Sequence, residues 1–381
     1  MDDFQVFVKP VGAICNMACK YCYYLEKHDL YPESTVFRMP DDLLEAYIVQ
    51  HISASSGPVI FFSWHGGEPT MAGLQFFKRM VRLQQKHVPE NCRIVNGLQT
   101  NGTLLNHEWC RFLKKENFVV GISLDGPEKF HSLNRIRKDG QSSFMEVLQG
   151  YRFLKSYGIP CEILCVVNSV NVLSPIELYR FFKSLEAEFI TFLPLVEPLN
   201  ATAKTVSERS VPAKAFGEFL CAIFDEWRAC DIGTVKIQIF EEALRTAFGL
   251  EHTLCIFKKI CGGVPVLEHN GDLYSCDHFV NREHLLGNIR KTSLARMLES
   301  PEQKKFGQAK LALLPMCCLE CEVRDMCNGG CPKDRFIDTA GGEPVLNYLC
   351  DGYKLFFRHC KPFVEQVAQI WRANSTGEVI G

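Results

Sequence analysis

Short apolar runs alternate with amphipathic stretches through the first half of the chain. Apolar residues recur at helical spacing in five stretches, residues 41–52, 74–87, 108–116, 143–157 and 175–185. Between these lie six runs with the length and composition of strands, at residues 6–8, 59–64, 93–98, 118–124, 161–167 and 189–195. Strands separated by helices at this spacing predict an α/β fold with parallel strands and right-handed crossovers. The sheet could form an incomplete barrel or an open, doubly wound sheet.

The alternation ends near residue 200. Residues 212–229 predict one helix with Trp227 on its apolar side, and residues 235–240 predict a further strand. From Cys255 onward the chain is rich in Cys, Gly and Pro and poor in long periodic segments. We expect such a region to need a covalent or metal crosslink, because it buries little apolar surface. The pattern therefore predicts two domains, residues 1–235 and 236–381.

Composition and charge narrow the class of protein. The 381 residues are 47% hydrophobic and 23% charged, with a formal net charge of −2. This balance points to neither nucleic acid nor an anionic membrane as a partner. The N-terminal sequence MDDFQVFVKP has no basic and then apolar region typical of a secretory signal. No apolar run approaches the ~20 residues that span a bilayer, so we expect a cytoplasmic protein.

The chain contains 19 cysteines. An odd number argues against complete pairing in disulfides. In a long chain without an export signal, metal binding or redox chemistry is the better interpretation.

Three of these cysteines form the most informative motif, Cys15-x3-Cys19-x2-Cys22, on a loop after Gly12. Cysteine thiolates normally hold all four irons of an iron–sulfur cube. Three local ligands therefore suggest a cube with one open iron, which can bind and activate a small molecule. The alternative is a zinc site with His28 as a possible fourth ligand, although zinc usually takes paired C-x2-C ligands.

A second motif, Gly66-Gly67-Glu68-Pro69, closes the second predicted strand. Adjacent glycines let a ligand approach the backbone closely. With the three-cysteine motif and the aromatic Tyr21 before its last cysteine, this turn resembles the radical S-adenosylmethionine (SAM) superfamily. The resemblance implies a partial (β/α)6 barrel and a [4Fe–4S] cluster whose open iron is chelated by SAM. It also implies that the Gly66–Glu68 turn contacts the SAM amine.

Three further positions resemble SAM contacts of that superfamily. Ser123 ends the fourth predicted strand, Arg135 follows in the next loop and could pair with the SAM carboxylate, and Val196 could line the adenosine pocket. A strand serine, a solvated arginine and a core valine are the structural alternatives.

Eight cysteines of the second half have metal-ligand spacing. They form Cys255-x5-Cys261-x14-Cys276 and Cys318-x2-Cys321-x5-Cys327-x3-Cys331, followed by Cys350. Spacing alone does not separate two zinc sites from two iron–sulfur sites. The arrangement resembles the SPASM extension of radical SAM enzymes, which holds two auxiliary [4Fe–4S] clusters. That resemblance implies two ligand sets: Cys255, Cys261, Cys276 and Cys331 for the first, and Cys318, Cys321, Cys327 and Cys350 for the second. Cys317 adjoins Cys318 and could compete with it.

Nearly the whole chain resembles the anaerobic sulfatase-maturating enzymes. The shared segments are Val8-Lys9-Pro10 and residues 64–69, 98–103, 123–127, 270–278 and 318–350. The resemblance implies oxidation of a Cys or Ser to Cα-formylglycine within a Cys/Ser-x-Pro/Ala-x-Arg sequence. It implies as partners an unfolded or nascent sulfatase peptide and an electron donor such as flavodoxin or ferredoxin. The alternatives are another SPASM-type enzyme that makes peptide crosslinks and a non-enzymatic zinc-binding module.

This reaction needs a base and an electron acceptor. By the same resemblance Asp277, directly after Cys276, is the proton acceptor, and the auxiliary clusters can take the electron. We expect a dry pocket to raise the pKa of Asp277. Its neighbour His278 is the rival base.

Overall fold

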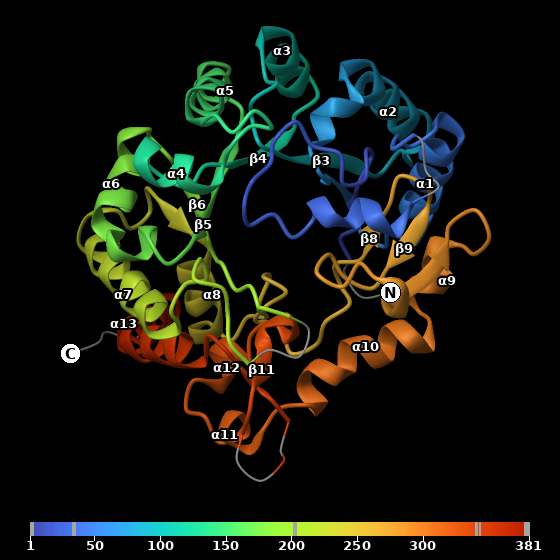
Figure 1. Ribbon diagram of the computed structural model, residues 1–381. Coiled ribbons are helices and arrows are strands. Elements are labelled where there is room, and N and C mark those ends of the chain that lie inside the picture. Colours follow the sequence, from blue (N-terminus) through green and yellow to red (C-terminus); the bar gives the residue numbers. More distant parts are fainter. Residues whose placement is uncertain (1–3, 33–35, 201–203, 340–341, 343, 377–381) are drawn as a thin grey trace. The chain divides into compact units, whose positions relative to one another are not determined.

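The computed structural model describes residues 4–32, 36–200, 204–339, 342 and 344–376 (Figure 1). Backbone contacts divide the chain into two compact units. The first unit contains residues 1–124, 131–163 and 262–307, and the second contains residues 125–130, 164–261 and 308–381. The domains expected from the sequence, residues 1–235 and 236–381, stay a prediction.

The first unit contains most of the alternating strands and helices. Its elements are β1 (Phe7–Val8), α1 (Asp41–Ala54), β2 (Val59–Trp64), α2 (Leu74–His87), β3 (Arg93–Thr100), α3 (His107–Lys115), β4 (Val119–Ser123), α5 (Phe144–Ser156), β8 (Val266–Leu267), β9 (Asp272–Tyr274), β10 (Leu285–Asn288) and α9 (Leu294–Leu298). Three elements pass from one unit to the other: α4 (Glu128–Asn134), β5 (Cys161–Val167) and α10 (Pro301–Ala312). The six predicted strands and five predicted helices of the N-terminal half are present, with bounds shifted by at most two residues.

The sheet of the first unit runs in the order β10-β9-β8-β1-β2-β3-β4. Strands β1 to β4 are parallel, as the alternation with helices predicts. Strand β8 is parallel to β1, with Phe7 opposite Val266, whereas β9 and β10 are antiparallel to their neighbours. A segment more than 250 residues distant in sequence therefore extends the sheet beside the N-terminal strand.

Aromatic side chains fill the core between this sheet and its helices. Trp64 at the end of β2 is fully buried, with the rings of Phe76 and Phe77 of α2 at 6.1 and 6.0 Å. Such edge-to-face pairs stabilise beyond the area that they bury. The Trp64 indole N–H donates to Asn96 Oδ1 at 2.9 Å, so the one polar group of this ring is satisfied.

The second unit is largely helical. Its elements are α6 (Pro175–Ser184), β6 (Phe189–Pro194), α7 (Ala213–Cys230), β7 (Lys236–Ile237), α8 (Gln238–Ala247), α11 (Met316–Leu319), α12 (Arg324–Cys327), β11 (Arg335–Ile337), β12 (Leu346–Asn347) and α13 (Cys350–Thr376). Strands β6 and β7 are parallel. Helix α13 crosses α7 so closely that a Cβ on Gly352 would lie 2.1 Å from the carbonyl oxygen of Ala213.

Two expectations for this unit were wrong. Of the strand predicted at residues 235–240, only Lys236–Ile237 is a strand, and α8 begins at Gln238. Ile239, Phe240 and Ala243 are buried, so helical spacing decides this segment.

The cysteine-rich segment also contains more regular structure than expected. Helix α13 extends over 27 residues from Cys350. Its buried residues recur every three or four positions, which is the spacing of a helix face: Tyr353, Phe356, Phe357, Cys360, Val364 and Ala368.

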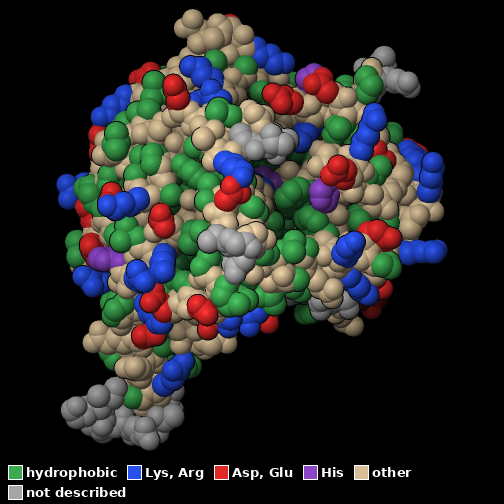
Figure 2. Space-filling view, turned by 60° about the horizontal axis from the view of Figure 1, so that its bottom comes forward, with side chains coloured by type: hydrophobic (Ala, Val, Ile, Leu, Met, Phe, Trp, Pro, Cys, Tyr) green, Lys and Arg blue, Asp and Glu red, His purple; other side chains and the backbone are tan. Residues whose placement is uncertain are grey.

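Charged side chains of both signs are interspersed over the face shown in Figure 2. Among the helices that the structure describes, none combines the length and the apolar character needed to cross a bilayer.

Candidate active site

The three-cysteine motif lies on the loop between β1 and the 3-10 helix Leu25–Leu30. The backbone N–H of Met17 donates to Cys15 Sγ at 3.3 Å, and the N–H of Cys22 donates to the Cys19 carbonyl at 3.1 Å. The pKa of Cys15 is raised to about 12, mainly by burial, with smaller contributions from negative charge on Glu68, Cys19 and Cys22. The three thiols therefore lie close enough to influence one another.

The loop after β4 is paired with this cysteine loop. The N–H groups of Ala18 and Lys20 donate to the carbonyls of Ile136 and Asn134, both at 2.9 Å. Between these two contacts the buried Arg135 donates from Nη1 to the Tyr21 hydroxyl at 3.0 Å. The structure thus brings together two of the residues predicted to contact SAM.

The Gly66-Gly67 turn packs against the same loop. Gly67 N–H donates to the Gly12 carbonyl at 2.9 Å, and Glu68 N–H donates to the Ile14 carbonyl at 2.8 Å. A Cβ at Gly67 would lie 2.1 Å from the Ile14 oxygen, and Gly66 has a φ of 123°. The glycines are needed because the cysteine loop itself approaches the turn. A role of the turn in binding the SAM amine stays a prediction.

The Glu68 carboxylate is fully buried and joins the ends of β2 and β3. It accepts hydrogen bonds from the Thr70 hydroxyl at 2.5 Å, the Thr100 hydroxyl at 2.7 Å and the Asn101 N–H at 2.7 Å. Burial raises its pKa, and these hydrogen bonds only partly offset that effect. In this structure the side chain holds the strand ends in place.

Asn101 connects this network to the cysteine loop. Its side-chain amide donates to Asn16 Oδ1 at 2.9 Å and to Cys15 Sγ at 3.7 Å. At the end of β3, Gln99 Nε2 donates to the Ser123 hydroxyl at 3.1 Å. The predicted residues Glu68 and Ser123 therefore both lie where parallel strands end, the edge at which α/β sheets bind ligands.

Asp277 follows β9 and lies beside β1. Its Oδ1 atom is 2.7 Å from Lys9 Nζ, and its Oδ2 atom accepts a hydrogen bond from the Tyr23 hydroxyl. Lys9 directly follows β1, is 2% exposed, and lies 4.2 Å from the ring centroid of Tyr24. Pairing of β8 with β1 brings these groups together. The His278 ring is 4.9 Å from that of Tyr23.

The protonation state of Asp277 differs from the expectation. Burial does raise the pKa of this carboxyl, but the cationic Lys9 and His278 and the hydrogen bonds from Lys9 and Tyr23 outweigh burial. The pKa is held well below its usual range, so Asp277 is a carboxylate at neutral pH. The predicted upward shift was wrong because it considered burial without the buried cation.

The second predicted set of auxiliary ligands is assembled in the second unit. Cys318 lies in α11, Cys327 ends α12 and Cys350 begins α13. The pKa of Cys327 is raised to about 12, mainly by burial and to a smaller extent by the charges of Cys350 and Cys321. The pKa of Cys318 is also raised to about 12, mainly by burial and to a smaller extent by Cys350, Cys317 and Cys327.

The first predicted set is divided between the units. Cys255, Cys261 and Cys331 lie around the buried Lys310 of the second unit. Cys276 belongs to the first unit, where its charge acts on Tyr23. Val196, the remaining predicted contact, is buried in the second unit after β6.

Thiols are the donor type that holds iron–sulfur cubes. Among the described residues no three Cys, His, Asp or Glu side chains are arranged to hold one metal ion. A cube does not require this arrangement, since each of its thiolates binds a different iron. The N–H groups directed at Cys15 Sγ suit a thiolate ligand, and metal coordination deprotonates such thiols outright.

Four residues with a place in these sites were given no role from the sequence: Lys9, Tyr23, Lys310 and Arg335. The sequence did contain a signal for Lys9, because it lies at the carboxyl end of a predicted parallel strand, where functional groups of α/β proteins gather. For Lys310 and Arg335 the sequence contained no such signal.

Comparison with known proteins identifies the domains and the family of the chain. Residues 10–182 match the Radical SAM superfamily, and residues 261–322 match the SPASM iron–sulfur cluster-binding domain. A serine-type anaerobic sulfatase-maturating enzyme of Bacteroides thetaiotaomicron is 44% identical over 94% of this chain and 90% of its own length. A cysteine-type anaerobic sulfatase-maturating enzyme of Clostridium perfringens is 32% identical over 97% and 99%.

The solved structures lead to the same family. The structure of anSMEcpe with bound AdoMet and Kp18Cys peptide has a TM-score of 0.86 and 31% identity, and covers 96% of this chain and 99% of that one. The predicted radical SAM fold, with its parallel sheet and C-terminal SPASM domain, is therefore confirmed. The cofactors that this fold uses are [4Fe–4S] clusters and SAM. The chain belongs to the anaerobic sulfatase-maturating enzymes of the radical SAM superfamily.

Proposed function

We propose that this enzyme oxidises a Cys or Ser side chain of a sulfatase peptide to Cα-formylglycine, within a Cys/Ser-x-Pro/Ala-x-Arg sequence. The observation that carries the proposal is the largely buried carboxylate of Asp277, held between Lys9 and Tyr23 on the segments that contain Cys276 and Cys22. Relatives named for both serine-type and cysteine-type maturation support it.

Eleven cysteines hold the proposed clusters. Cys15, Cys19 and Cys22 bind the cube that takes SAM, and the two auxiliary sets are Cys255, Cys261, Cys276 and Cys331, and Cys318, Cys321, Cys327 and Cys350. When bound, the clusters and SAM supply one-electron chemistry that removes a hydrogen atom from the substrate Cβ. Tyr21, Gly66, Gly67, Glu68, Ser123, Arg135 and Val196 position SAM in this proposal.

The chain's own contribution is to take a proton at Asp277. Conversion of a side-chain alcohol to an aldehyde removes two hydrogens, so a proton and an electron must leave after the first hydrogen atom. A carboxylate can take the proton only if it is ionised, and Lys9 keeps Asp277 ionised. The same ion pair weakens Asp277 as a base, since a general base works best when its pKa lies near the working pH. Lys9 and Tyr23 also fix the direction in which the two oxygens point.

The partners of this reaction are part of the proposal. A bound peptide in the homologous structure agrees with a peptide substrate. We propose that the peptide is unfolded or nascent, that flavodoxin or ferredoxin supplies the electron, and that the enzyme works in the cytoplasm.

Anaerobic incubation with SAM, a chemical reductant and paired Cys and Ser peptides tests the function. The Ser peptide should lose two hydrogens, and the Cys peptide should additionally exchange sulfur for oxygen, both detected by mass spectrometry. Formation of 5′-deoxyadenosine without peptide change would overturn the substrate. A crosslinked peptide would instead assign the chain to another SPASM reaction.

A further inference from the structure

Two cations in the cysteine-rich part of the second unit, the buried Lys310 and the partly buried Arg335, have no carboxylate partner among the described residues. Lys310 is 1% exposed, and its ammonium donates to the carbonyls of Cys255 at 3.0 Å and Ile256 at 2.8 Å. In the described part of the chain, neither Lys310 nor Arg335 forms an ion pair with Asp or Glu. Buried charges are costly unless an opposite charge compensates them.

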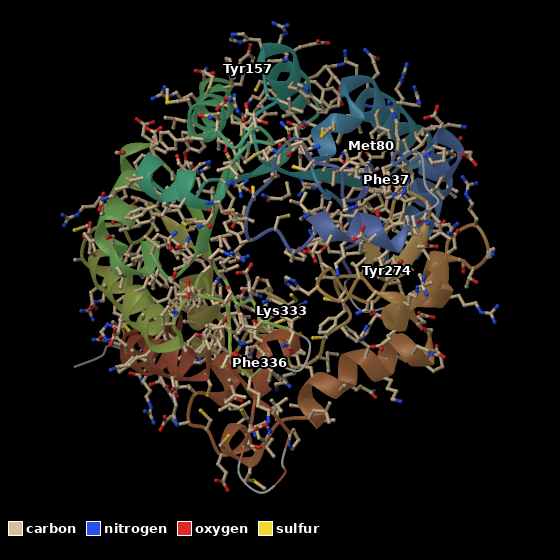
Figure 3. The ribbon with its side chains drawn as sticks, in the orientation of Figure 1. Phe37, Met80, Tyr157, Tyr274, Lys333 and Phe336 are labelled. Atoms are coloured by element: carbon tan, nitrogen blue, oxygen red, sulfur yellow. The ribbon has the colours of Figure 1, made fainter. Side chains whose placement is uncertain are left out.

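Among the described residues, the groups that hold Arg335, at the start of β11, are backbone carbonyls. Its guanidinium donates to the carbonyls of Gly329 at 3.1 Å, Asn328 at 3.2 Å and Lys310 at 2.6 Å. Figure 3 labels two residues of the same segment, Lys333 and Phe336. Arg335 therefore forms hydrogen bonds both with the turn between Cys327 and Cys331 and with the backbone of Lys310, the other cation.

Beyond these carbonyls, cysteine thiols act electrostatically on both cations. Lys310 interacts electrostatically with Cys255, Cys261 and Cys331. Arg335 interacts with Cys318, Cys261, Cys327 and Cys331, which belong to both auxiliary ligand sets. Burial lowers the pKa of each cation, and ionised thiols oppose that effect. The thiolates of bound clusters would supply the missing negative charge.

We propose that Arg335 and Lys310 are fixed positive charges that raise the reduction potentials of the two auxiliary clusters, so that these clusters accept the electron released by the substrate. A cube with four thiolates has a net negative charge, and reduction adds one more. A buried cation therefore stabilises the reduced form more than the oxidised form. In the reaction, the substrate loses an electron and a proton, the electron reduces one ferric iron, and the proton goes to Asp277. This inference rests on the ligand sets of the proposed function.

Redox titration of the full-length enzyme, monitored by electron paramagnetic resonance, tests it. A background variant with Cys15, Cys19 and Cys22 changed to Ala isolates the auxiliary clusters. In this background Arg335→Gln should shift the midpoint potentials of both auxiliary clusters to more negative values. Lys310→Gln should shift mainly the cluster of Cys255, Cys261 and Cys331.

Two matched variants separate charge from geometry. Arg335→Lys keeps the charge but loses the forked hydrogen bonds, so its potentials should stay near those of the unmodified background. Arg324→Gln removes an arginine that is 44% exposed in the same cysteine-rich segment, where water screens the charge. It should shift the potentials less than Arg335→Gln does.

The possible failures are distinguishable. The role of charge would be overturned if Arg335→Gln left the potentials unshifted, or if Arg335→Lys and Arg335→Gln shifted them equally. Neither result would contradict the proposed ligand sets. If Arg335→Gln does not retain iron, unshifted potentials in Lys310→Gln overturn the role of charge. The background variant should retain roughly two thirds of the iron of three cubes. Full iron retention there would instead refute the proposed function.

Discussion

The cations beside the proposed sites of the two units differ in their partners. In the first unit the buried Lys9 pairs with Asp277, a carboxylate that is 14% exposed, at 2.7 Å. In the second unit the buried Lys310 and the partly buried Arg335 lie among backbone carbonyls, and in the described residues neither is paired with an acid. A carboxylate can hold a proton, whereas cations beside thiolates favour electron uptake. The comparison supports the proposal that the first region transfers a proton and the second accepts an electron.

The largest effect should come from the carboxylate that accepts the proton. Asp277→Asn keeps the size of the side chain and removes its basicity, so formylglycine formation should fall about 100-fold or more. Formation of 5′-deoxyadenosine should continue, because the three-cysteine loop is intact. Both products can be measured in one chromatographic assay. Asp272→Asn, on the nearby β9, is the control and should retain product. Undiminished formylglycine in Asp277→Asn would remove Asp277 from this role.

Removal of the buried cation should lower the stability of the fold as well as formylglycine formation. Lys9→Met leaves a largely buried carboxylate uncompensated, which costs about 3–5 kcal/mol in the free energy of unfolding. Lys78→Met breaks an exposed pair with Glu108 and should cost at most about 1 kcal/mol. Urea denaturation under anaerobic conditions measures both variants. Equal stabilities of the two would mean that the Lys9–Asp277 pair is not a buried ion pair in solution.

Substitution of one glycine in each unit tests the proposed function of that unit separately. A Cβ at Gly67 would meet the Ile14 carbonyl, and one at Gly352 would meet the Ala213 carbonyl, each at 2.1 Å. Backbone atoms cannot move aside like flexible side chains, so Gly67→Ala and Gly352→Ala should each cost about 1–3 kcal/mol. Gly67→Ala should impair SAM cleavage, whereas Gly352→Ala should impair iron retention at the cluster of Cys350. Iron analysis and 5′-deoxyadenosine formation distinguish them.

The control for both is Gly57→Ala, since the nearest atom to its added Cβ is 3.9 Å away. This variant should resemble the unmodified enzyme. If Gly67→Ala and Gly352→Ala lose the same function, the division of labour between the two regions is wrong.

Local patterns predicted much of the fold and part of the site. The bounds of β2, β5 and α2 follow from periodicity alone, and the three-cysteine loop from spacing. The position of Asp277 beside Lys9 was not accessible in this way, because it depends on β8 pairing with β1 across more than 250 residues. The direction of the Asp277 pKa shift was predicted wrongly for the same reason. Helix α13 was missed because cysteines and charged residues obscure its periodic apolar face.

The smallest predicted effect is a loss of stability as the pH falls, and it concerns histidines of the first unit. Three histidines of the first unit, the buried His51 and His131 and the partly buried His65, have lowered pKa values: desolvation lowers them to about 4 for His51, 2 for His131 and 3 for His65. His51 is 1% exposed, with Nε2 2.9 Å from the Phe61 carbonyl and Nδ1 3.1 Å from the Tyr47 hydroxyl. Its imidazole therefore stays neutral in the folded chain, whereas the unfolded chain binds a proton below a pKa of 6.5.

The sign of the pH dependence follows from this difference. Stability from His51 is complete above pH 6.5 and is lost as the pH falls toward about 4, because protons then favour the unfolded chain. Between about pH 7.5 and 5.5 this single group should cost about 1.4 kcal/mol. His51→Gln should reduce the loss of stability over that interval by this amount, measured by urea denaturation at both pH values. His107→Gln, at an exposed position on α3, should leave the pH dependence unchanged. If both variants show the same pH dependence as the unmodified enzyme, His51 is already protonated in the folded chain at pH 5.5. That outcome would contradict the assignment of a neutral imidazole to His51.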